Sequence, residues 1–404
     1  MSLVLNKPRA THVLAEAGVD AIVGSTFQNV FYLSGYAGFA QRLNPATQVY
    51  AVVRADALTA PSLVAPISDL DLQAQFPAEL DTIQAYGQRF YLEPSATDEP
   101  LSDESERYAR LAELDLAESP AAALSAVLAA LPTGSRIAID ERGMAVATRD
   151  ALISRFGDAI VMGAALLDTI RMIKTPEEVR RLEAAALAIE SSYERAIEAA
   201  AEGMSEAELA SIFDQHTIEQ GSTPHFTVLA FGERGALPNA IPSTWRRLRP
   251  GDTIRFDIGC RTELYSSDIA RTAVFGTPSE KVVRYYDAIL AGEQRMLEVM
   301  RPGVAAKDVF AAAMEASRES GIPHYRRHHV GHGVGLDTYD APLLDATTET
   351  PLEPGMVFEI ETPYYELGFG GLQVEDTVVI TEDGCRLLTR SSRELSLIEN
   401  VSIQ

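Results

Sequence analysis

Two aspartates at expected strand positions constrain this chain more than any other feature. Residues 253–258 alternate polar and apolar side chains, 259–263 break the pattern and 266–274 resume it, which predicts two strands joined by a turn. Asp257 and Asp268 stand on these strands, where a carboxylate is a poor strand former and a poor core residue. Two carboxylates that face each other across a hairpin repel unless a cation or a proton lies between them. Two solvated aspartates on an exposed face are the alternative interpretation.

More potential metal ligands follow towards the C-terminus. Three of the seven histidines lie within residues 328–332, and glycines flank His332. Glu361 and Glu375 fall on two further segments with a strand pattern. Four carboxylates and one imidazole form a mixed oxygen and nitrogen set, which suits Mn, Fe, Co or Zn better than a thiolate-preferring metal. Because four negative charges exceed what one divalent ion neutralises, we expect two ions, which about 3.5 Å apart can activate a water for attack on a carbonyl.

Length and composition indicate a soluble protein of two domains. The chain has 404 residues, of which 46% are hydrophobic, and no run of eighteen apolar residues that would span a membrane. Its net charge of −24 argues against nucleic acid as a partner. Residues 1–8 lack the pattern of a signal peptide, and Cys260 and Cys385 have no metal-ligand spacing, so we expect a cytoplasmic, reduced protein without a membrane partner.

The predicted domains are an α/β domain over residues 1–165 and a second α/β domain over 166–404. The first shows no assembled catalytic group, and its segment 29–36 is aromatic and rich in strand formers. The second opens with a strong helix start, because Thr175 can be the N-cap, Pro176 suits the first helical position and Glu178 completes a capping box.

The second domain also repeats itself. Residues 202–221 align with 302–321 without a gap, and a glycine stands at 203 and 303 and again at 221 and 321. Each copy has a long helix, a glycine turn, a second helix and a strand-rich stretch. This pattern predicts a duplicated unit with pseudo-twofold symmetry, and a chance likeness between two Ala/Glu-rich helices is the alternative.

The ligand pattern resembles that of the pita-bread metallopeptidases, which include prolidase, aminopeptidase P, methionine aminopeptidase and the metal-free creatinase. The family's five ligands fall, in order, on Asp257, Asp268, His332, Glu361 and Glu375. Segments 29–36 and 171–178 are similar to hallmarks of the prolidase and creatinase branch. The resemblance implies a creatinase-like N-terminal domain followed by a pita-bread catalytic domain.

The resemblance also implies roles for individual residues. Asp257 would bind one ion in bidentate fashion, Asp268 and Glu375 would bridge the two ions, and His332 would complete one shell. Glu361 would bind a metal and serve as general base, returning the proton to the leaving amine. A further histidine, His328, matches one that contacts the substrate in the proline-specific members.

Three positions depart from the family pattern. Tyr339 replaces the catalytic histidine seven residues after the ligand histidine, Asn239 replaces another active-site histidine, and Gln373 replaces the arginine two residues before the last glutamate. Each replacement can form hydrogen bonds, but neither a phenol nor an amide moves a proton easily at neutral pH, so we expect polarisation instead of acid–base exchange. Tyr339 is then a candidate catalytic residue that donates to the developing oxyanion, and Asn239 and Gln373 are candidate substrate-binding residues. Three arginines are candidates for replacing the lost charge: Arg246, Arg247 and Arg271.

The resemblance implies a metal-dependent hydrolase of the Xaa-Pro peptide bond, either an Xaa-Pro dipeptidase or an aminopeptidase P. Its substrate would be a small peptide with proline second, its cofactor two divalent ions such as manganese, cobalt, zinc or iron, and its assembly a homodimer. The three departures motivate an alternative, a hydrolase or lyase of a small nitrogenous compound, as in ectoine hydrolase or creatinase. A catalytically dead binding module is a third possibility, but it predicts eroded ligands, and all five are present.

Overall fold

The computed structural model describes residues 4–93 and 100–399. The chain divides into two compact units, one over Met1–Arg171 and one over Met172–Gln404. The predicted boundary between residues 165 and 166 stays a prediction. No helix in the described ranges is long and apolar enough to cross a membrane.

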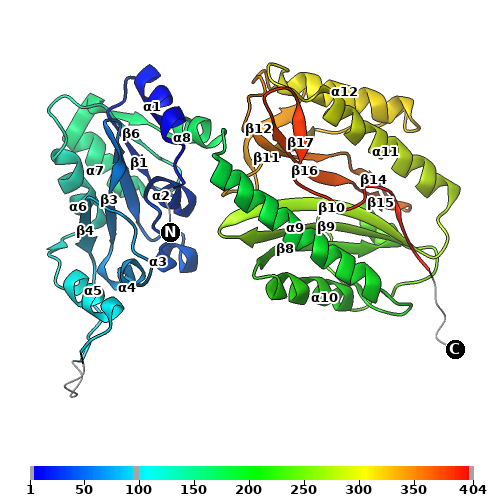
Figure 1. Cartoon of the computed structure of the whole chain (residues 1–404), viewed down its shortest axis with the longest axis horizontal. Coiled ribbons are helices and arrows are strands. Elements are labelled where there is room, and N and C mark those ends of the chain that lie inside the picture. Colours follow the sequence, from blue (N-terminus) through cyan, green and yellow to red (C-terminus); the bar gives the residue numbers. More distant parts are fainter. Residues whose placement is uncertain (1–3, 94–99, 400–404) are drawn as a thin grey trace. The chain divides into compact units, whose positions relative to one another are not determined.

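The first unit is a seven-stranded mixed sheet with helices packed around it, in strand order β5-β4-β3-β2-β1-β6-β7 (Figure 1). Its apolar core includes Val23, Val52 and Ile139 from the sheet and Leu124 and Leu152 from two helices. The elements are α1 (Lys7–Glu16), β1 (Ala21–Gly24), α2 (Phe27–Ser34), α3 (Phe39–Leu43), β2 (Tyr50–Arg54), β3 (Ala57–Pro66), α4 (Asp71–Gln75), β4 (Thr82–Tyr86), α5 (Asp103–Ala112), β5 (Leu116–Ala117), α6 (Pro120–Ala129), β6 (Ile137–Ile139), α7 (Val146–Phe156), β7 (Ile160–Met162) and α8 (Ala164–Arg171).

The aromatic segment 29–36 is helical as far as Ser34, which corrects the strand that its composition favours. It belongs to α2, whose N-cap Thr26 accepts a hydrogen bond from the backbone N–H of Asn29. Gly35 ends the helix in the left-handed conformation at φ 74°. The caps and the burial of the helix decide its conformation, because strand propensity is only a weak preference and tertiary packing overrides it.

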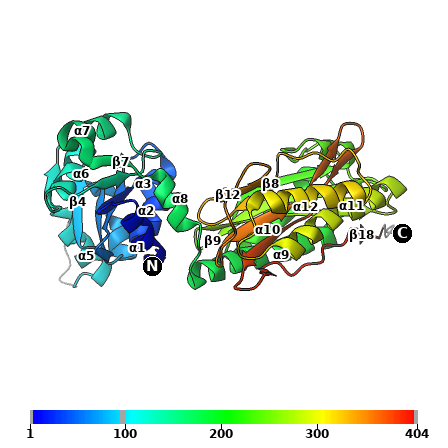
Figure 2. The ribbon, with the colours of Figure 1, turned by 90° about the horizontal axis from the view of Figure 1, so that it is seen from above.

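The second unit is built on a nine-stranded sheet whose main path runs β12-β11-β13-β16-β10-β9-β8. Helices α9 and α10 pack on the β8–β10 half, and α11 and α12 pack against β12 and β13 (Figures 1 and 2). The elements are α9 (Pro176–Ala199), α10 (Glu206–Glu219), β8 (Thr223–Phe231), β9 (Thr253–Thr262), β10 (Tyr265–Phe275), α11 (Glu280–Val299), α12 (Ala306–Glu319), β11 (His329–Gly333), β12 (Asp340–Asp345), β13 (Val357–Glu361), β14 (Tyr364–Glu366), β15 (Gly370–Leu372), β16 (Glu375–Ile380), β17 (Cys385–Leu387) and β18 (Ser396–Ile398).

The predicted repeat of the second unit is confirmed by its helices. Helices α10 and α12 each have 14 residues and begin 100 positions apart. The turns before them contain Gly203 and Gly303, which take left-handed φ values of 82° and 87°. The predicted capping box at the start of α9 is also present, with Thr175 accepting from the backbone N–H of Glu178 and Glu178 accepting from that of Thr175.

The two halves of the repeat differ at one helix start, which gives a stability prediction. Ser205 caps α10 in a capping box, whereas the equivalent Ala305 has similar extended φ and ψ angles but no capping side chain. We expect Ser205→Ala to destabilise the protein by about 1 kcal/mol, because the backbone N–H of Glu208 loses its acceptor. Ala305→Ser should change stability far less, because the N–H groups of Ala306, Lys307 and Asp308 already donate to backbone carbonyl oxygens. Thermal unfolding would measure both shifts. A stabilisation by Ala305→Ser as large as the loss in Ser205→Ala would show that the backbone acceptors at the start of α12 do not replace a side-chain cap.

Candidate metal centre

The register of the large sheet places all four predicted carboxylate ligands on one face. Asp257 on β9 pairs with Ala270 on β10, Ala270 pairs with Glu375 on β16, and Glu375 pairs with Glu361 on β13. Residues directly opposite each other in a sheet point to the same side, so these positions form one row across four strands. Asp268 stands two residues before Ala270 on β10 and therefore shares the face.

His332 lies on the same face of the sheet, on strand β11 next to β13. It pairs with Glu359, two residues before Glu361. Its Nε2 lies 3.8 Å from Oδ2 of Asp268, and ligand atoms of Asp268, His332 and Glu375 all lie within 4.8 Å of one another. Its Nδ1 lies 3.1 Å from the carbonyl oxygen of Gly333 and so acts as the N–H donor, which leaves the Nε2 lone pair facing the carboxylates. Burial lowers the pKa of His332 to about 4, in keeping with a neutral imidazole.

The carboxylates of this face are buried close enough to disturb one another. Burial first, and then repulsion from the neighbouring carboxylates, raise the pKa of Asp268 and of Glu375 well above the usual range. Burial raises the pKa of Glu361 to about 7, opposed by Arg327 and reinforced by Asp257. Burial also raises the pKa of Asp257, against the nearby Arg255. Such a cluster stays ionised only with cations bound between its members.

A fifth carboxylate on this face, Glu359, was given no role by the sequence analysis. It is fully buried on β13, and its Oε1 lies 3.3 Å from the backbone N–H of Asp268, which donates to it. Burial raises its pKa to about 8. The alternation of the strand could have identified it, because Glu359 and Glu361 are two residues apart and face the same side.

Two arginines also reach the carboxylates. Nη1 of Arg255 lies 3.3 Å from Oδ2 of Asp257, and Nη2 of Arg327 lies 3.3 Å from Oε1 of Glu361. Five ionised carboxylates, two arginines and a neutral His332 leave a net charge of −3. Within the described chain, Oδ1 of Asp268 and Oε2 of Glu359 are buried without a hydrogen-bond partner. A negative cluster of oxygen atoms with one free imidazole nitrogen fits divalent cations.

The predicted polar residues around the ligands occupy different depths. Tyr339 is 62% exposed and stacks on His332 at a ring distance of 3.8 Å. Partial burial and then the four carboxylate ligands raise its pKa, so the phenol keeps its proton. Gln373 is 2% exposed, and its Nε2 donates to Oε2 of Glu361 at 3.3 Å. Gln373 therefore lies beneath the ligands.

Of the three predicted substrate-binding residues, His328 and Asn239 are exposed, whereas Gln373 is buried. His328 meets the ring of His329 edge-on at 4.2 Å, and it is His329 whose Nδ1 lies 3.2 Å from Oε1 of Glu361. Asn239 follows Leu237 and Pro238 on the loop after β8. The sequence placed His329 in the histidine cluster 328–332 but gave it no role, and strand alternation could not have placed it beside His332, because the register of β11 against β12 shifts between these two residues.

The three arginines considered as replacements for the family's arginine pair elsewhere. Arg246 contacts Asp252 at 2.6 Å, and Arg247 contacts Glu208 at 2.8 Å. The third, Arg271, points to the opposite face of the sheet. Arg255 and Arg327 instead contact the side-chain carboxylates of predicted ligands.

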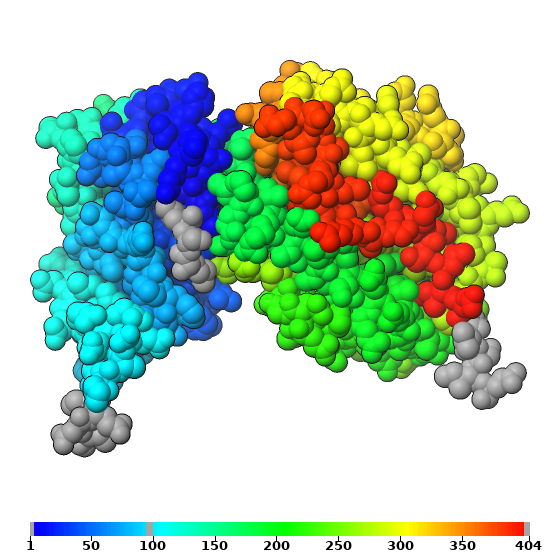
Figure 3. All heavy atoms as spheres, viewed as in Figure 1, coloured from blue at the N-terminus to red at the C-terminus, as the bar shows by residue number. Residues whose placement is uncertain are grey.

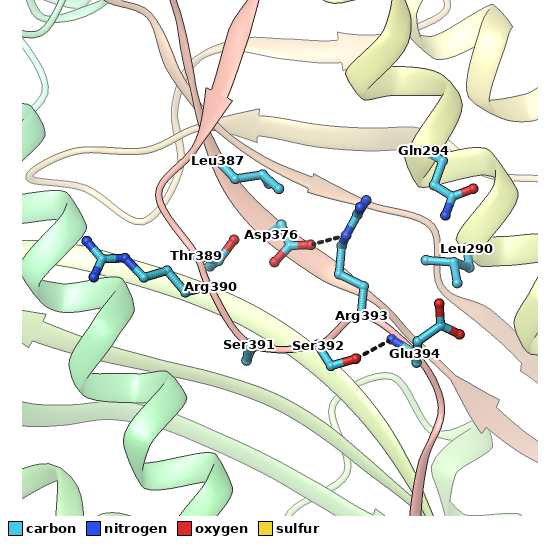
Figure 4. A pocket seen from close by; sticks show the side chains of 10 residues that line it. All are labelled: Leu290, Gln294, Asp376, Leu387, Thr389, Arg390, Ser391, Ser392, Arg393 and Glu394. Atoms are coloured by element: carbon cyan, nitrogen blue, oxygen red, sulfur yellow. Dashed lines mark hydrogen bonds and ion pairs between the residues drawn. The ribbon is translucent and has the colours of Figure 1, made fainter.

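Arg271 belongs to a buried network of charged groups on the opposite side of the sheet from the predicted ligands. We call the side that carries the ligands the metal face. Nη2 of Arg271 lies 2.6 Å from Oδ1 of Asp376 and 3.0 Å from Oγ of Ser391, and its Nη1 donates to the carbonyl oxygen of Glu375 at 2.6 Å. Figure 4 shows Asp376 paired with Arg393, whose Nε lies 3.9 Å from Oδ2 of Asp376, and both residues line a cavity of about 300 Å³. The network ties β10 and β16, which carry Asp268 and Glu375, to the C-terminal segment, which runs across the second unit (red in Figure 3).

Removing the arginine at the centre of this network should destabilise the protein strongly. We expect Arg271→Met to lower the free energy of unfolding by about 3–5 kcal/mol, because Asp376 would remain buried without its closest cation. Arg390→Met is the matched control, because Arg390 is mostly exposed and pairs with Glu183 at the surface. Chemical unfolding of the two variants tests the difference, and equal small losses would show that the buried network contributes little.

Comparisons with known proteins give a family match for each of the two units. Residues 180–382 match the model of metallopeptidase family M24, and residues 8–173 match the creatinase/prolidase N-terminal domain. The Xaa-Pro dipeptidase of Pyrococcus furiosus is 38% identical over 57% of this chain and 66% of its own length. An uncharacterised peptidase of Staphylococcus aureus is 31% identical over 64% of this chain and 74% of its own length. The chain thus spans just under two thirds of the Pyrococcus relatives that it matches.

Solved structures share both units of the fold. A dipeptidase from Pyrococcus horikoshii has a TM-score of 0.75 at 28% identity and covers 97% of this chain and 99% of its own. The prolidase from Pyrococcus furiosus has a TM-score of 0.71 at 27% identity, covering 95% and 99%. The chain therefore belongs to metallopeptidase family M24, with a creatinase/prolidase N-terminal domain before the pita-bread domain.

Proposed function

We propose that this protein hydrolyses the Xaa-Pro peptide bond of small peptides that carry proline in the second position. The convergence of Asp268, His332 and Glu375 on one buried sheet face, with ligand atoms within 4.8 Å of one another, is the observation that carries this proposal. The names of the relatives add to it, since they include Xaa-Pro dipeptidases and prolidases.

In this proposal two divalent ions, chosen from manganese, cobalt, zinc and iron, are held by Asp257, Asp268, His332, Glu361 and Glu375. Bound there, such ions polarise a carbonyl group and lower the pKa of a water molecule. Asp268, His332 and Glu375 offer ligand atoms within 4.8 Å of one another and would hold an ion together. Asp257 would supply ligand oxygens at the β9 end of the row.

Glu361 is the proposed general base. Its carboxylate is held by Arg327 and Gln373 at 3.3 Å each and lies 3.2 Å from Nδ1 of His329. It removes a proton from the attacking water while the water oxygen bonds to the carbonyl carbon. When the carbon–nitrogen bond breaks, Glu361 returns that proton to the proline nitrogen, so the proton balance closes within one residue.

Tyr339 is proposed to polarise the reacting carbonyl. Its phenol lies beside the ligand cluster on the exposed side of His332, and its raised pKa makes it a hydrogen-bond donor and not a base. His328 and Asn239, both exposed, are the proposed contacts for the proline end of the substrate. Gln373 is proposed to act on the substrate only through Glu361.

Three further features complete the proposal. They are a domain boundary between residues 165 and 166, a homodimer, and a cytoplasmic location. Manganese is the first metal to test, because oxygen ligands dominate the set.

The proposal predicts metal-dependent cleavage of Xaa-Pro peptides. Metal-stripped protein should release the first residue from Ala-Pro and from Ala-Pro-Gly only after Mn, Co or Zn is added, because the buried carboxylates need cations. Ala-Ala should react far more slowly, and Glu361→Gln, which keeps the shape but removes the base, should lower turnover by about 100-fold or more. Amino-acid analysis of the products gives both the bond cleaved and the ratio of dipeptide to tripeptide turnover.

An inactive wild-type protein that still binds two ions would contradict the proposal. It would favour a hydrolase of a small nitrogenous compound, with Tyr339, Asn239 and Gln373 as the residues that changed the substrate.

A further inference from the structure

Arg255 is the most enclosed positive charge of the metal face. It stands two residues before Asp257 on β9 and is fully buried. Its guanidinium group also lies over the ring of Tyr365, at 5.1 Å from the ring centre. A buried arginine needs several acceptors to offset the loss of hydration, so its contacts reveal what it holds in place.

The guanidinium group of Arg255 bonds on two sides. Its Nη1 donates to Oε1 of Gln373 at 2.8 Å and to Oδ2 of Asp257 at 3.3 Å. Its Nη2 donates to the carbonyl oxygens of Leu237 and Pro238, each at 2.8 Å. One side chain therefore connects a predicted ligand, a buried amide and the loop that carries Asn239.

Gln373 extends this connection to Glu361. An arginine offers only donors and a carboxylate only acceptors, so the amide of Gln373 must turn its oxygen towards Arg255 and its nitrogen towards Glu361. The two distances, 2.8 Å to Arg255 and 3.3 Å to Glu361, agree with that orientation. The amide thus joins the guanidinium group to the proposed base.

Gln373 occupies the position at which the family pattern has an arginine, and Arg255 on β9 donates a hydrogen bond to it. We propose that Arg255 replaces that missing charge from β9 and acts as a positioning residue, which orients Asp257 directly, orients Glu361 through Gln373 and fixes the loop before Asn239. This inference deepens the proposed function and rests on it for the role of Glu361. A glutamine suits position 373 because a second guanidinium group there would meet the first.

Exchanging the two residues tests the inference. The variants are Arg255→Gln, the exchange Arg255→Gln with Gln373→Arg, and Arg255→Lys. Arg246→Gln is the matched control, because it breaks an arginine–aspartate pair that does not contact the carboxylates. Calorimetric titration of metal-stripped protein with Mn gives the metal affinity without any peptide, and kcat/KM on Ala-Pro is measured in parallel.

We expect Arg255→Gln to bind Mn about 10- to 100-fold more weakly, as is usual when a residue that orients a ligand is lost. The exchange should recover most of that affinity, because a guanidinium group returns between Asp257 and Glu361. Arg255→Lys should also bind Mn more weakly than the wild type, since an ammonium group lacks the planar fork that reaches Gln373 and both loop carbonyls. Arg246→Gln should keep the wild-type affinity.

Wild-type affinity in Arg255→Gln, or an exchange variant that folds and binds no better than Arg255→Gln, would overturn the inference. If neither of these variants folds, Gln373→Met decides, because it keeps Arg255 and cuts the connection to Glu361; unchanged Mn binding would then overturn the inference and weaker binding would support it. If the wild-type protein cleaves no Xaa-Pro peptide while Arg255→Gln still weakens Mn binding, the proposed function fails and the positioning role stands.

Discussion

Repulsion between buried carboxylates is the constraint on which the second unit depends. Asp257, Asp268, Glu359, Glu361 and Glu375 come from four strands and share one face of the sheet. Burial of their negative charges in a low-dielectric site is unfavourable, so they stay ionised only if cations lie beside them. Arg255 and Arg327 offset two of the five charges. Two bound divalent ions would change the remaining net charge of −3 to +1, which one hydroxide ion would neutralise.

The rest of the second unit holds these groups in register. The row from Asp257 to Glu361 crosses β9, β10, β16 and β13, with Ala270 as the one small member beneath the ligands. On the other face, Arg271 and Asp376 link β10 to β16, where the strands share a single paired position. The two faces of the same strands therefore have different roles. One carries the carboxylates, and on the other an arginine–aspartate pair holds β10 to β16.

The sequence predicted the parts that obey simple periodicity. Alternation located Asp257, Asp268, Glu361 and Glu375, and the same rule would have found Arg255 and Glu359, each two residues before a predicted ligand. His329 and Arg327 could not be found in this way, because the irregular register of β11 and the loop before it break the alternation. The strand order β13-β16-β10 brings distant segments together and follows from no local pattern. In the first unit, Thr26 and Gly35 were the cap signals that would have identified α2 as a helix.

The most direct test of this account is the number and position of metal ions in crystals grown with manganese, read from anomalous scattering. The account predicts two peaks between the carboxylates, one of them touching His332, and both within bonding distance of Asp268 and Glu375. A single peak, or peaks that touch neither of these two residues, would contradict the dinuclear centre.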